Sequence, residues 1–216
     1  IMMKLLDIKG NILPLTEDNA NLIGITDDNK KIIGEEQITK CPNKIKKIEY
    51  DQKITINQQV ISAVNESDLI IFSSGSLLTS IAPHLINKTL VKALKKSSAP
   101  KMYICNLFTQ PGETDNFKVS DHIKILESYL GSKSIDVVVA NNNMLDSKLV
   151  NIYQTTEQKD PVLLDEENLK KLNVKILADD LAKIEDGVYR HDSLKTAYLI
   201  FSYLMNSSKV TKENNQ

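Results

Sequence analysis

A run of small hydroxylated residues at 73–80 (Ser-Ser-Gly-Ser-Leu-Leu-Thr-Ser) has the composition of an anion-binding turn. It follows a short apolar run and leads into a predicted helix, where free main-chain N–H groups and the helix dipole favour a negatively charged ligand. Gly75 lets the backbone approach such a ligand closely. A solvated turn with an N-cap explains the same residues without a ligand. The segment is neither a Walker A motif, which needs a lysine, nor a G-x-G-x-x-G fingerprint. The hydroxyl groups that can donate to phosphate belong to Ser73, Ser74, Ser76, Thr79 and Ser80.

A second polar loop, 106–114 (Asn-Leu-Phe-Thr-Gln-Pro-Gly-Glu-Thr), also follows a short apolar run. Asn106, Thr109 and Gln110 carry side chains that can hydrogen-bond a planar polar group such as a base or a sugar. The proline–glycine pair of this loop predicts a type II turn. Glu113 can hold a metal ion or accept a hydrogen bond from a sugar hydroxyl. The alternative is a structural turn that leaves Glu113 in solvent.

A third polar cluster, Arg190-His191-Asp192, precedes the last predicted helix. The Arg190 guanidinium suits bidentate recognition of phosphate or carboxylate. Asp192 is a natural cap for the helix that follows, and a lone histidine such as His191 is more often structural than catalytic. The spacing of the polar residues supports neither a Ser-His-Asp nor a Cys-His triad.

Composition excludes several classes of function. The chain has 27 Lys+Arg against 28 Asp+Glu, no Trp, and no basic patch with interleaved aromatic residues, so we expect no nucleic-acid partner. Cys41 and Cys105 are too far apart in sequence for a zinc or redox motif, which indicates two reduced thiols of a cytosolic protein. No apolar run approaches the ~20 residues that span a bilayer, and the first residues lack the features of a signal peptide. We therefore expect a cytoplasmic protein without a membrane span.

The polar loops need elements that hold them together, and the apolar pattern predicts these. Short apolar runs alternate with amphipathic segments after about residue 57, which indicates βαβ units, a parallel sheet and helices on both of its faces. Residues 21–50 form a β-rich excursion, in which two strands flank the turn 27–30; segment 44–50 is read as a strand or a short helical turn. The loops after parallel strands meet at one edge of the sheet, where ligands bind. The expected buried strands are 68–72, 101–106 and 135–140, with weaker candidates at 161–164 and 174–177. The expected helices are 57–67, 76–96 in two pieces broken at Pro83, 120–130 with Ser120 as N-cap, and 193–205; segment 166–172 lies between the two weaker strand candidates.

Two motifs of this chain resemble those of a known family. Residues 74–83 (SGSLLTSIAP) resemble the G-P-G-S-L-Y-T-S-I-x-P segment of the CofD-like family, in its bacterial gluconeogenesis factor (YvcK-like) branch. Residues 105–114 (CNLFTQPGET) are similar to the C-N-L-M-T-Q-P-G-E-T motif of that branch, which is highly specific. Shorter matches occur in the same order along nearly the whole chain, at 11–16, 34–35, 121–122 and 190–192.

The resemblance implies a Rossmann-like α/β fold with a nucleotide-type ligand at the carboxyl edge of the sheet. Members of this branch are linked to growth on gluconeogenic carbon sources, to cell shape and to nucleotide-sugar binding. The founding branch is a transferase that joins a 2-phospholactate unit from a nucleotide diphosphate donor to a deazaflavin, with Mg²⁺. Carried over by motif, the diphosphate-holding segment comprises Ser74, Gly75, Ser76, Leu77, Thr79 and Ser80. The ligand cleft is lined by Asn106, Thr109, Gln110, Gly112, Glu113 and Thr114, and Arg190 meets a phosphate or a partner surface.

The chain departs from the family pattern at three places. Ser73 and Ser74 stand where the family has Gly-Pro, and Leu78 stands where it has Tyr. The family's G-G-G-T-G and D-D-G-G-S-S-G loops have no counterpart in this sequence. Because the second of these loops carries the acidic pair most suited to a metal, its absence weakens a catalytic interpretation, and no metal ligand is assigned.

These observations predict one CofD-like α/β domain over residues 1–205, followed by a disordered tail at 206–216. The function predicted is that of a nucleotide-sugar- or dinucleotide-binding regulatory protein of the gluconeogenesis factor type, which signals to a partner protein by a change of conformation. We expect the protein to form a homo-oligomer. If Mg²⁺ is a cofactor, we expect it to bind together with a nucleotide diphosphate ligand. The alternatives are an enzyme similar to 2-phospho-L-lactate transferase and an α/β interaction module with a vestigial site.

Overall fold

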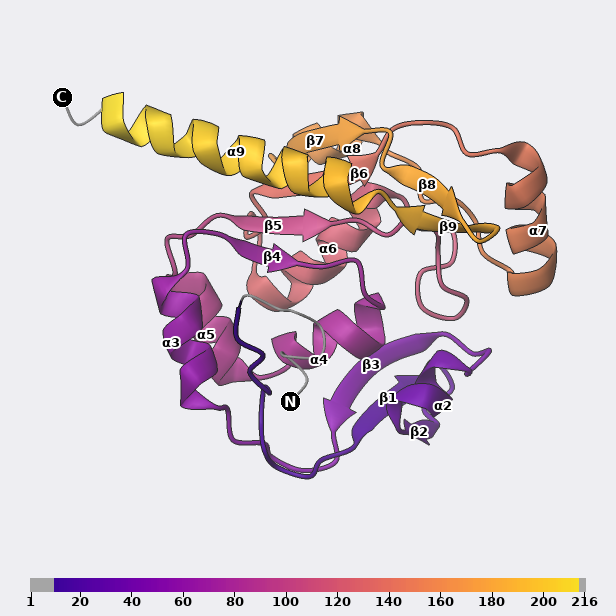
Figure 1. Cartoon of the computed structure of the whole chain (residues 1–216). Coiled ribbons are helices and arrows are strands. Elements are labelled where there is room, and N and C mark those ends of the chain that lie inside the picture. The colour runs from indigo at the N-terminus through magenta and orange to yellow at the C-terminus, as the bar shows by residue number, and fades with distance from the viewer. Residues whose placement is uncertain (1–9, 214–216) are drawn as a thin grey trace.

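A four-stranded parallel sheet forms the centre of the fold (Figure 1). The structure, a computed structural model, describes residues 10–213. The two central strands are apolar runs buried on both faces, as the interior of a parallel sheet requires, and the spatial order of all four strands follows the chain. This confirms the predicted fold class. The strands are β4 (Ile70–Phe72), β5 (Lys101–Ile104), β6 (Val137–Asn141) and β7 (Lys175–Asp179).

Helices cover both faces of this sheet. Tyr103 and Val138 point into the larger core, where several helices pack. Met102 and Val139 point to the opposite face, which the long helix α9 (Ser193–Glu213) covers (Figure 1). Because side chains alternate along a strand, the two apolar cores lie back to back across the sheet. The helices of the larger core are α3 (Gln58–Glu66), α5 (Lys88–Lys96), α6 (Val119–Leu130) and α8 (Glu166–Lys171).

The predicted β-rich excursion is a three-stranded antiparallel sheet with its own small core. Its first two strands form the predicted hairpin, and segment 44–50 is a strand rather than a helical turn. Ile38 and Ile48 pack against Leu78 and Ala82 of the main unit, so the excursion is attached by apolar contact. Its elements are β1 (Leu22–Thr26), β2 (Lys31–Ile33), the unpredicted α2 (Glu35–Thr39) and β3 (Ile45–Tyr50).

Two predicted helix boundaries are wrong. The break in segment 76–96 does not fall at Pro83, which lies in the first turn of α4 (Ala82–Leu85), where a missing N–H costs little. A π-helical turn, η1 (Leu77–Ile81), precedes α4, and α5 starts afresh because Asn87 Oδ1 accepts the N–H groups of its first turn. Ser120 does not cap α6, which begins one residue earlier; its Oγ donates to Asp165 Oδ2 at 2.6 Å.

Three further features of the described chain were not predicted or differ from the prediction. Helix α7 (Ser147–Glu157) and a hairpin of β8 (Ala182–Glu185) and β9 (Val188–His191) follow β6 and β7. Segment 161–164 contributes a single bridge, from Pro161 to Phe108, instead of a strand. Helix α9 continues to Glu213, through most of the segment predicted as a tail. The single-domain boundary and the disorder of 206–216 stay predictions.

Both cysteines are free and buried, as two reduced thiols would be. Cys41 belongs to the core of the excursion, and Cys105 directly follows β5 in the larger core. Within residues 10–213, no helix combines the length and the apolar character needed to cross a membrane.

Candidate functional site

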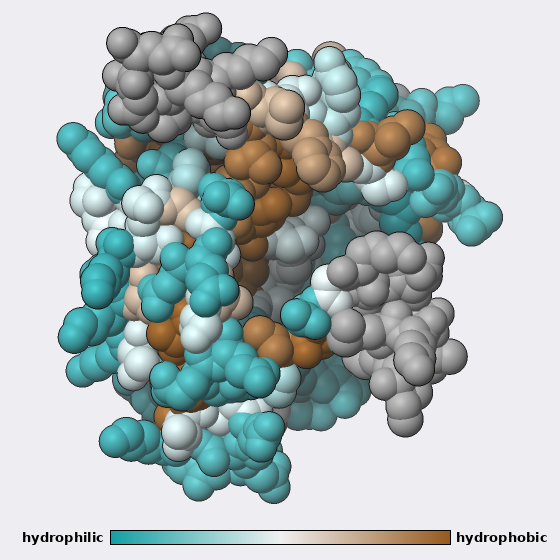
Figure 2. All heavy atoms as spheres, turned by 60° about the vertical axis from the view of Figure 1, so that its left-hand side comes forward, coloured by the Kyte–Doolittle hydropathy of each residue, from teal (hydrophilic) through white to brown (hydrophobic). Residues whose placement is uncertain are grey.

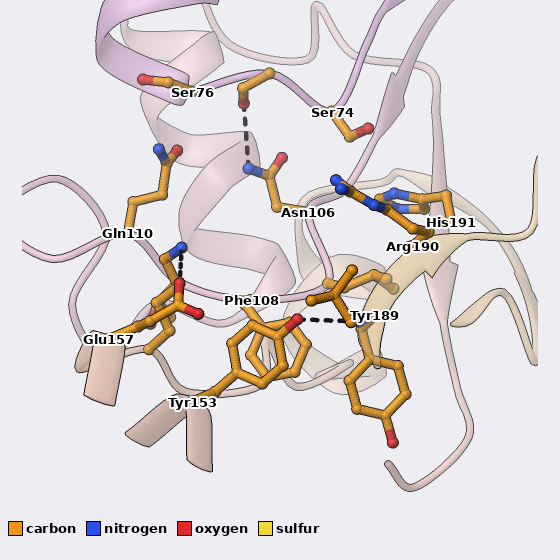
Figure 3. A pocket seen from close by; sticks show the side chains of 15 residues that line it. Ser74, Ser76, Asn106, Phe108, Gln110, Tyr153, Glu157, Tyr189, Arg190 and His191 are labelled. Carbon is orange, nitrogen blue, oxygen red and sulfur yellow. Dashed lines mark hydrogen bonds and ion pairs between the residues drawn. The ribbon is translucent and has the colours of Figure 1, made fainter. Parts of the chain in front are cut away.

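A cleft of about 520 Å³ opens where the loops after β4 and β5 meet the β8–β9 hairpin (Figure 3). This is the carboxyl edge of the parallel sheet, where ligands bind in open α/β folds, and its volume is that of a small-molecule site. Seven of the predicted site residues line it: Ser74, Gly75, Ser76, Asn106, Thr109, Gln110 and Arg190. Six do not line it: Leu77, Thr79, Ser80, Gly112, Glu113 and Thr114.

The backbone N–H groups of Leu78 and Thr79, at the start of η1, already donate hydrogen bonds to side chains of the protein. Leu78 N–H donates to Glu113 Oε2 at 3.3 Å, and Thr79 N–H donates to Ser76 Oγ at 3.0 Å. Ser76 Oγ in turn donates to Glu113 Oε2 at 2.6 Å. The amides of Leu78 and Thr79 therefore do not form the exposed anion seat that the sequence predicts. The part of this loop that faces the cleft is 74–76.

Glu113 is buried under this loop, neither in solvent nor in the cleft. Its side chain is 7% exposed, and burial raises the pKa of its carboxyl above the usual value. Oε2 accepts from Ser76 and Leu78, whereas Oε1 has no hydrogen-bond partner among the described residues. Its role is to join the 106–114 loop to the beginning of η1. No local pattern reveals this, because the partners are more than 30 residues apart in sequence.

Replacing Glu113 with Gln is expected to flatten the pH dependence of stability above pH 4.5, the ordinary glutamate pKa. In that range the folded state keeps a proton on Glu113 that the unfolded chain has lost, so the wild-type free energy of unfolding falls as the pH rises through the raised pKa. Urea unfolding between pH 4 and pH 8 measures both slopes. The exposed Glu66→Gln serves as the control. Equal slopes for wild type and Glu113→Gln would contradict the assignment.

Gly112 and Thr114 shape the second loop instead of lining the cleft. Gly112 has φ +78°, as the predicted type II turn requires, and its N–H donates to Asp115 Oδ2 at 2.8 Å. A Cβ at this position would lie 2.7 Å from the carbonyl oxygen of Cys41, so the loop touches the excursion backbone directly. Thr114 Oγ1 accepts the N–H of Gln110 at 2.8 Å, which fixes the residue that does face the cleft.

Asn106 ties the two loops together. Its Nδ2 donates to the Gly75 carbonyl at 3.1 Å (Figure 3). Its Oδ1 accepts from the Tyr103 hydroxyl at 3.3 Å. Tyr103 also bonds His122 Nδ1 at 2.9 Å. His122 is fully buried, and burial lowers its pKa to about 4, so the ring is neutral at physiological pH. A buried chain of polar groups thus holds Asn106 in one orientation at the floor of the cleft.

Arg190 reaches the cleft from β9, and Figure 3 shows its guanidinium directed toward Ser74 and Asn106. The side chain is exposed, and the structure gives it no ion pair among the described residues. Asp186 and Gly187 both have positive φ, which identifies the type I′ turn that sets the hairpin register. His191 bonds the Cys105 carbonyl through Nε2 at 3.0 Å, and burial lowers its pKa. His191 thereby anchors the hairpin to the end of β5.

An aromatic wall completes the cleft, and sequence reasoning missed it. Phe108 and Tyr153 stack with ring centroids 4.4 Å apart and an interplanar angle of 18°. The ring centroids of Tyr189 and Phe108 lie 5.6 Å apart. The backbone N–H of Tyr189 donates to the Tyr153 hydroxyl at 3.0 Å. The one signal available was Asp146, which caps the first turn of α7 and so places Tyr153 on a helix.

The charged groups of the cleft do not make a metal site. Glu157 is the single carboxylate in its lining, and it pairs with Lys159 at 2.6 Å. Across residues 10–213, no three His, Cys, Asp or Glu side chains gather as a cation would require. The described residues therefore do not fit a protein-held Mg²⁺.

Comparison with known proteins matches this architecture. A Thermotoga maritima protein whose name describes a gluconeogenesis factor is 39% identical over 206 residues, which are 93% of this chain and 64% of that protein. The "Gluconeogenesis factor" of Bacillus subtilis is 32% identical over 94% of this chain and 64% of its own length. A crystal structure of a Bacillus halodurans protein superposes with a TM-score of 0.85 at 32% identity, over 93% of this chain and 64% of that chain.

This chain thus spans less than two-thirds of the length of these relatives. The family described as "2-phospho-L-lactate transferase CofD" matches residues 1–182, which contain both polar loops and the strands that carry them. The resemblance inferred from the two loop motifs is confirmed, and the chain belongs to the CofD family.

Proposed function

We propose that this chain is the ligand-binding part of a regulatory protein of the gluconeogenesis factor type, and that it binds a nucleotide sugar or a dinucleotide. Effects on cell shape and on growth with gluconeogenic carbon sources, a cytoplasmic location, a partner protein and a homo-oligomeric state belong to the same proposal. The names of the relatives support the gluconeogenesis factor type.

The observation that carries the proposal is the set of groups around the cleft. Arg190 offers a guanidinium without an ion pair among the described residues, opposite the small loop 74–76, which suits a diphosphate. Gln110 Oε1 is buried without a hydrogen-bond partner among the described residues, so a ligand hydroxyl would satisfy it. The aromatic wall at Phe108 and Tyr153 offers apolar ring surface for a base or sugar.

A binding role follows from this set better than turnover does. The groups above recognise charge, hydroxyls and a flat ring, whereas the one carboxylate of the cleft is held by Lys159. Ligand capture between a loop of the sheet and the β8–β9 hairpin would change the position of the hairpin relative to the sheet. That movement is the signal we assign to the protein.

The family description supports a second candidate, a transferase that uses a nucleotide diphosphate donor. Incubation with such a donor, a deazaflavin acceptor and Mg²⁺ tests it directly. Product formation would favour the enzyme, and absence of product under every metal condition would remove it.

Replacing Arg190 with Gln is expected to weaken binding of a UDP-sugar about 10- to 100-fold, because a hydrogen bond to a charged group contributes about 1.5–3 kcal/mol. Isothermal titration calorimetry measures the affinity. Lys183→Gln is the matched control, since Lys183 lies opposite Arg190 in the register of the hairpin but does not line the cleft. Arg190 is a cleaner target than Ser76, whose hydroxyl is bonded to Glu113. Equal affinities for wild type and Arg190→Gln would exclude this site.

A further inference from the structure

A groove of about 870 Å³ lies between the antiparallel excursion and the main unit. One wall is the end of β3 with the chain that follows it, and the other is formed by the link between α4 and α5 and by the end of α6. A smaller extension of about 380 Å³ continues along α5. Leu85, Lys88 and Tyr129 line both parts, which therefore form one groove. It shares no lining residue with the cleft.

The rim of this groove is strongly basic. Five lysines and one glutamate line it, which leaves four positive charges, whereas the whole chain carries −1. Lys47 pairs with the glutamate, Glu49, at 2.9 Å. The other four lysines are exposed and form no ion pair with a described residue: Lys53, Lys88, Lys92 and Lys95. Unpaired charge of one sign in one groove favours an anionic partner and speeds its encounter with the protein.

The lysines of α5 share one face of that helix. Lys88, Lys92 and Lys95 recur at intervals of four and three residues, which is the spacing of neighbours on a helix surface. Leu90 and Leu94 lie on another face and line a separate apolar pocket; Figure 2 shows apolar side chains gathered in a hollow on the side of the molecule that carries α3. Lys88 stands in the first turn, where the helix dipole disfavours a cation and no acidic residue compensates it. The stability of α5 therefore does not explain this charge.

The floor of the groove is apolar and recessed below the lysines. Ile48, Ile54 and Leu85 line it and are buried, and the large exposed apolar side chains of the described residues all lie elsewhere. The groove therefore has no side chain that could insert into a bilayer. A nucleic acid fits less well than a peptide, because the rings of Tyr50 and Tyr129 pack against the cores and offer little surface for base stacking. A peptide can place an apolar side chain on such a floor.

We propose that this groove binds an acidic peptide segment of a partner protein. Carboxylates of the segment pair with the lysines of the rim, and one aliphatic or aromatic side chain of the segment packs on the floor. The net charge of the groove sets the sign of the occupant, and the apolar floor selects a peptide over a simple anion. Because the groove and the cleft are separate, the peptide binds whether or not the cleft takes a nucleotide.

Phage display of random peptides on the whole chain, with depletion on the double variant Lys53→Glu/Lys88→Glu, tests the proposal. We expect the selected peptides to be rich in Asp and Glu and to share an apolar residue. In fluorescence anisotropy, a selected peptide should bind the double variant about tenfold or more weakly than the wild type, because each change replaces an attraction with a repulsion. Hydrogen exchange should slow at 47–54 and 85–92 when the peptide binds.

Lys96→Glu is the matched control. Lys96 is exposed on the same helix but does not line the groove. It lies about 12 Å along the helix from Lys88, which exceeds the screening length of ~8 Å at physiological ionic strength. Its replacement should leave the affinity unchanged. Circular dichroism checks that all variants fold.

Three results would overturn the proposal. The first is a selection that enriches no peptide, or peptides without an excess of acidic residues. The second is an affinity that stays the same when the apolar residue of the peptide is replaced with Ser, which would reduce the groove to a site for any polyanion. The third is a single-stranded oligonucleotide that displaces the selected peptide and binds more tightly, which would assign the groove to a nucleic acid.

Discussion

Gly112→Ala is expected to lower the free energy of unfolding by about 3 kcal/mol. A non-glycine residue at positive φ costs roughly 1–2 kcal/mol, and forcing an extra methyl group into a packed contact costs about 1–3 kcal/mol more. Both conditions hold at Gly112, where φ is +78° and the added Cβ would lie 2.7 Å from the Cys41 carbonyl oxygen. A backbone oxygen cannot rotate away as a flexible side chain can. The loop or the excursion must therefore shift.

Gly187→Ala separates the two costs. Gly187 also has φ +78°, but nothing lies within 4 Å of the position its Cβ would take. This variant should therefore lose about 1 kcal/mol, from backbone strain alone. Urea unfolding of the two variants measures the difference. Equal losses would show that the contact between Gly112 and Cys41 is not tight in solution.

Between pH 6.5 and pH 4 the protein is expected to lose about 3 kcal/mol of stability through His122 alone. Burial lowers the pKa of this ring from 6.5 to about 4, and each unit of difference between the folded and unfolded states corresponds to about 1.4 kcal/mol. Below pH 6.5 His122 binds a proton in the unfolded chain but not in the folded state. The contribution of His122 to the free energy of unfolding is therefore fully present above pH 6.5 and is lost as the pH falls toward 4.

His122→Gln is expected to flatten that slope, whatever its effect on stability at neutral pH. The exposed His84→Gln on α4 is the control, and its slope should match the wild type. His191, whose pKa burial also lowers, adds a smaller contribution of the same sign to all three proteins. Proton-detected NMR of the histidine rings gives the titration directly. A His122 ring that titrates near pH 6.5 would show that it is solvated, which would contradict its burial.

The sheet could be predicted from the sequence because its strands are local patterns. Segments 68–72, 101–106 and 135–140 are apolar runs of strand length, and all three overlap strands of the parallel sheet. The β8–β9 hairpin was missed although Asp186-Gly187 is a strong type I′ signal, because its strands have only four residues each and the second, Val188–His191, does not alternate apolar with polar residues.

The candidate site could be predicted only where its residues follow strands. Loops 74–76 and 106–110 reach the cleft because parallel strands deliver their ends to one edge. Glu113 was misplaced because burial beneath another loop is a tertiary event that a polar motif does not reveal. The aromatic wall at Phe108, Tyr153 and Tyr189 was invisible for the same reason, since three separate elements bring these rings together.

The two buried cysteines give the native protein its own reporters of local opening. Burial raises the pKa of the Cys105 thiol to about 12, so almost none of the reactive thiolate exists at neutral pH while the strand end is closed. An alkylating reagent reaches this sulfur when the main core transiently separates, and it reaches Cys41 when the excursion does. The labelling rates of the two sulfurs therefore distinguish a molecule in which the excursion detaches first from one that opens as a single cooperative unit.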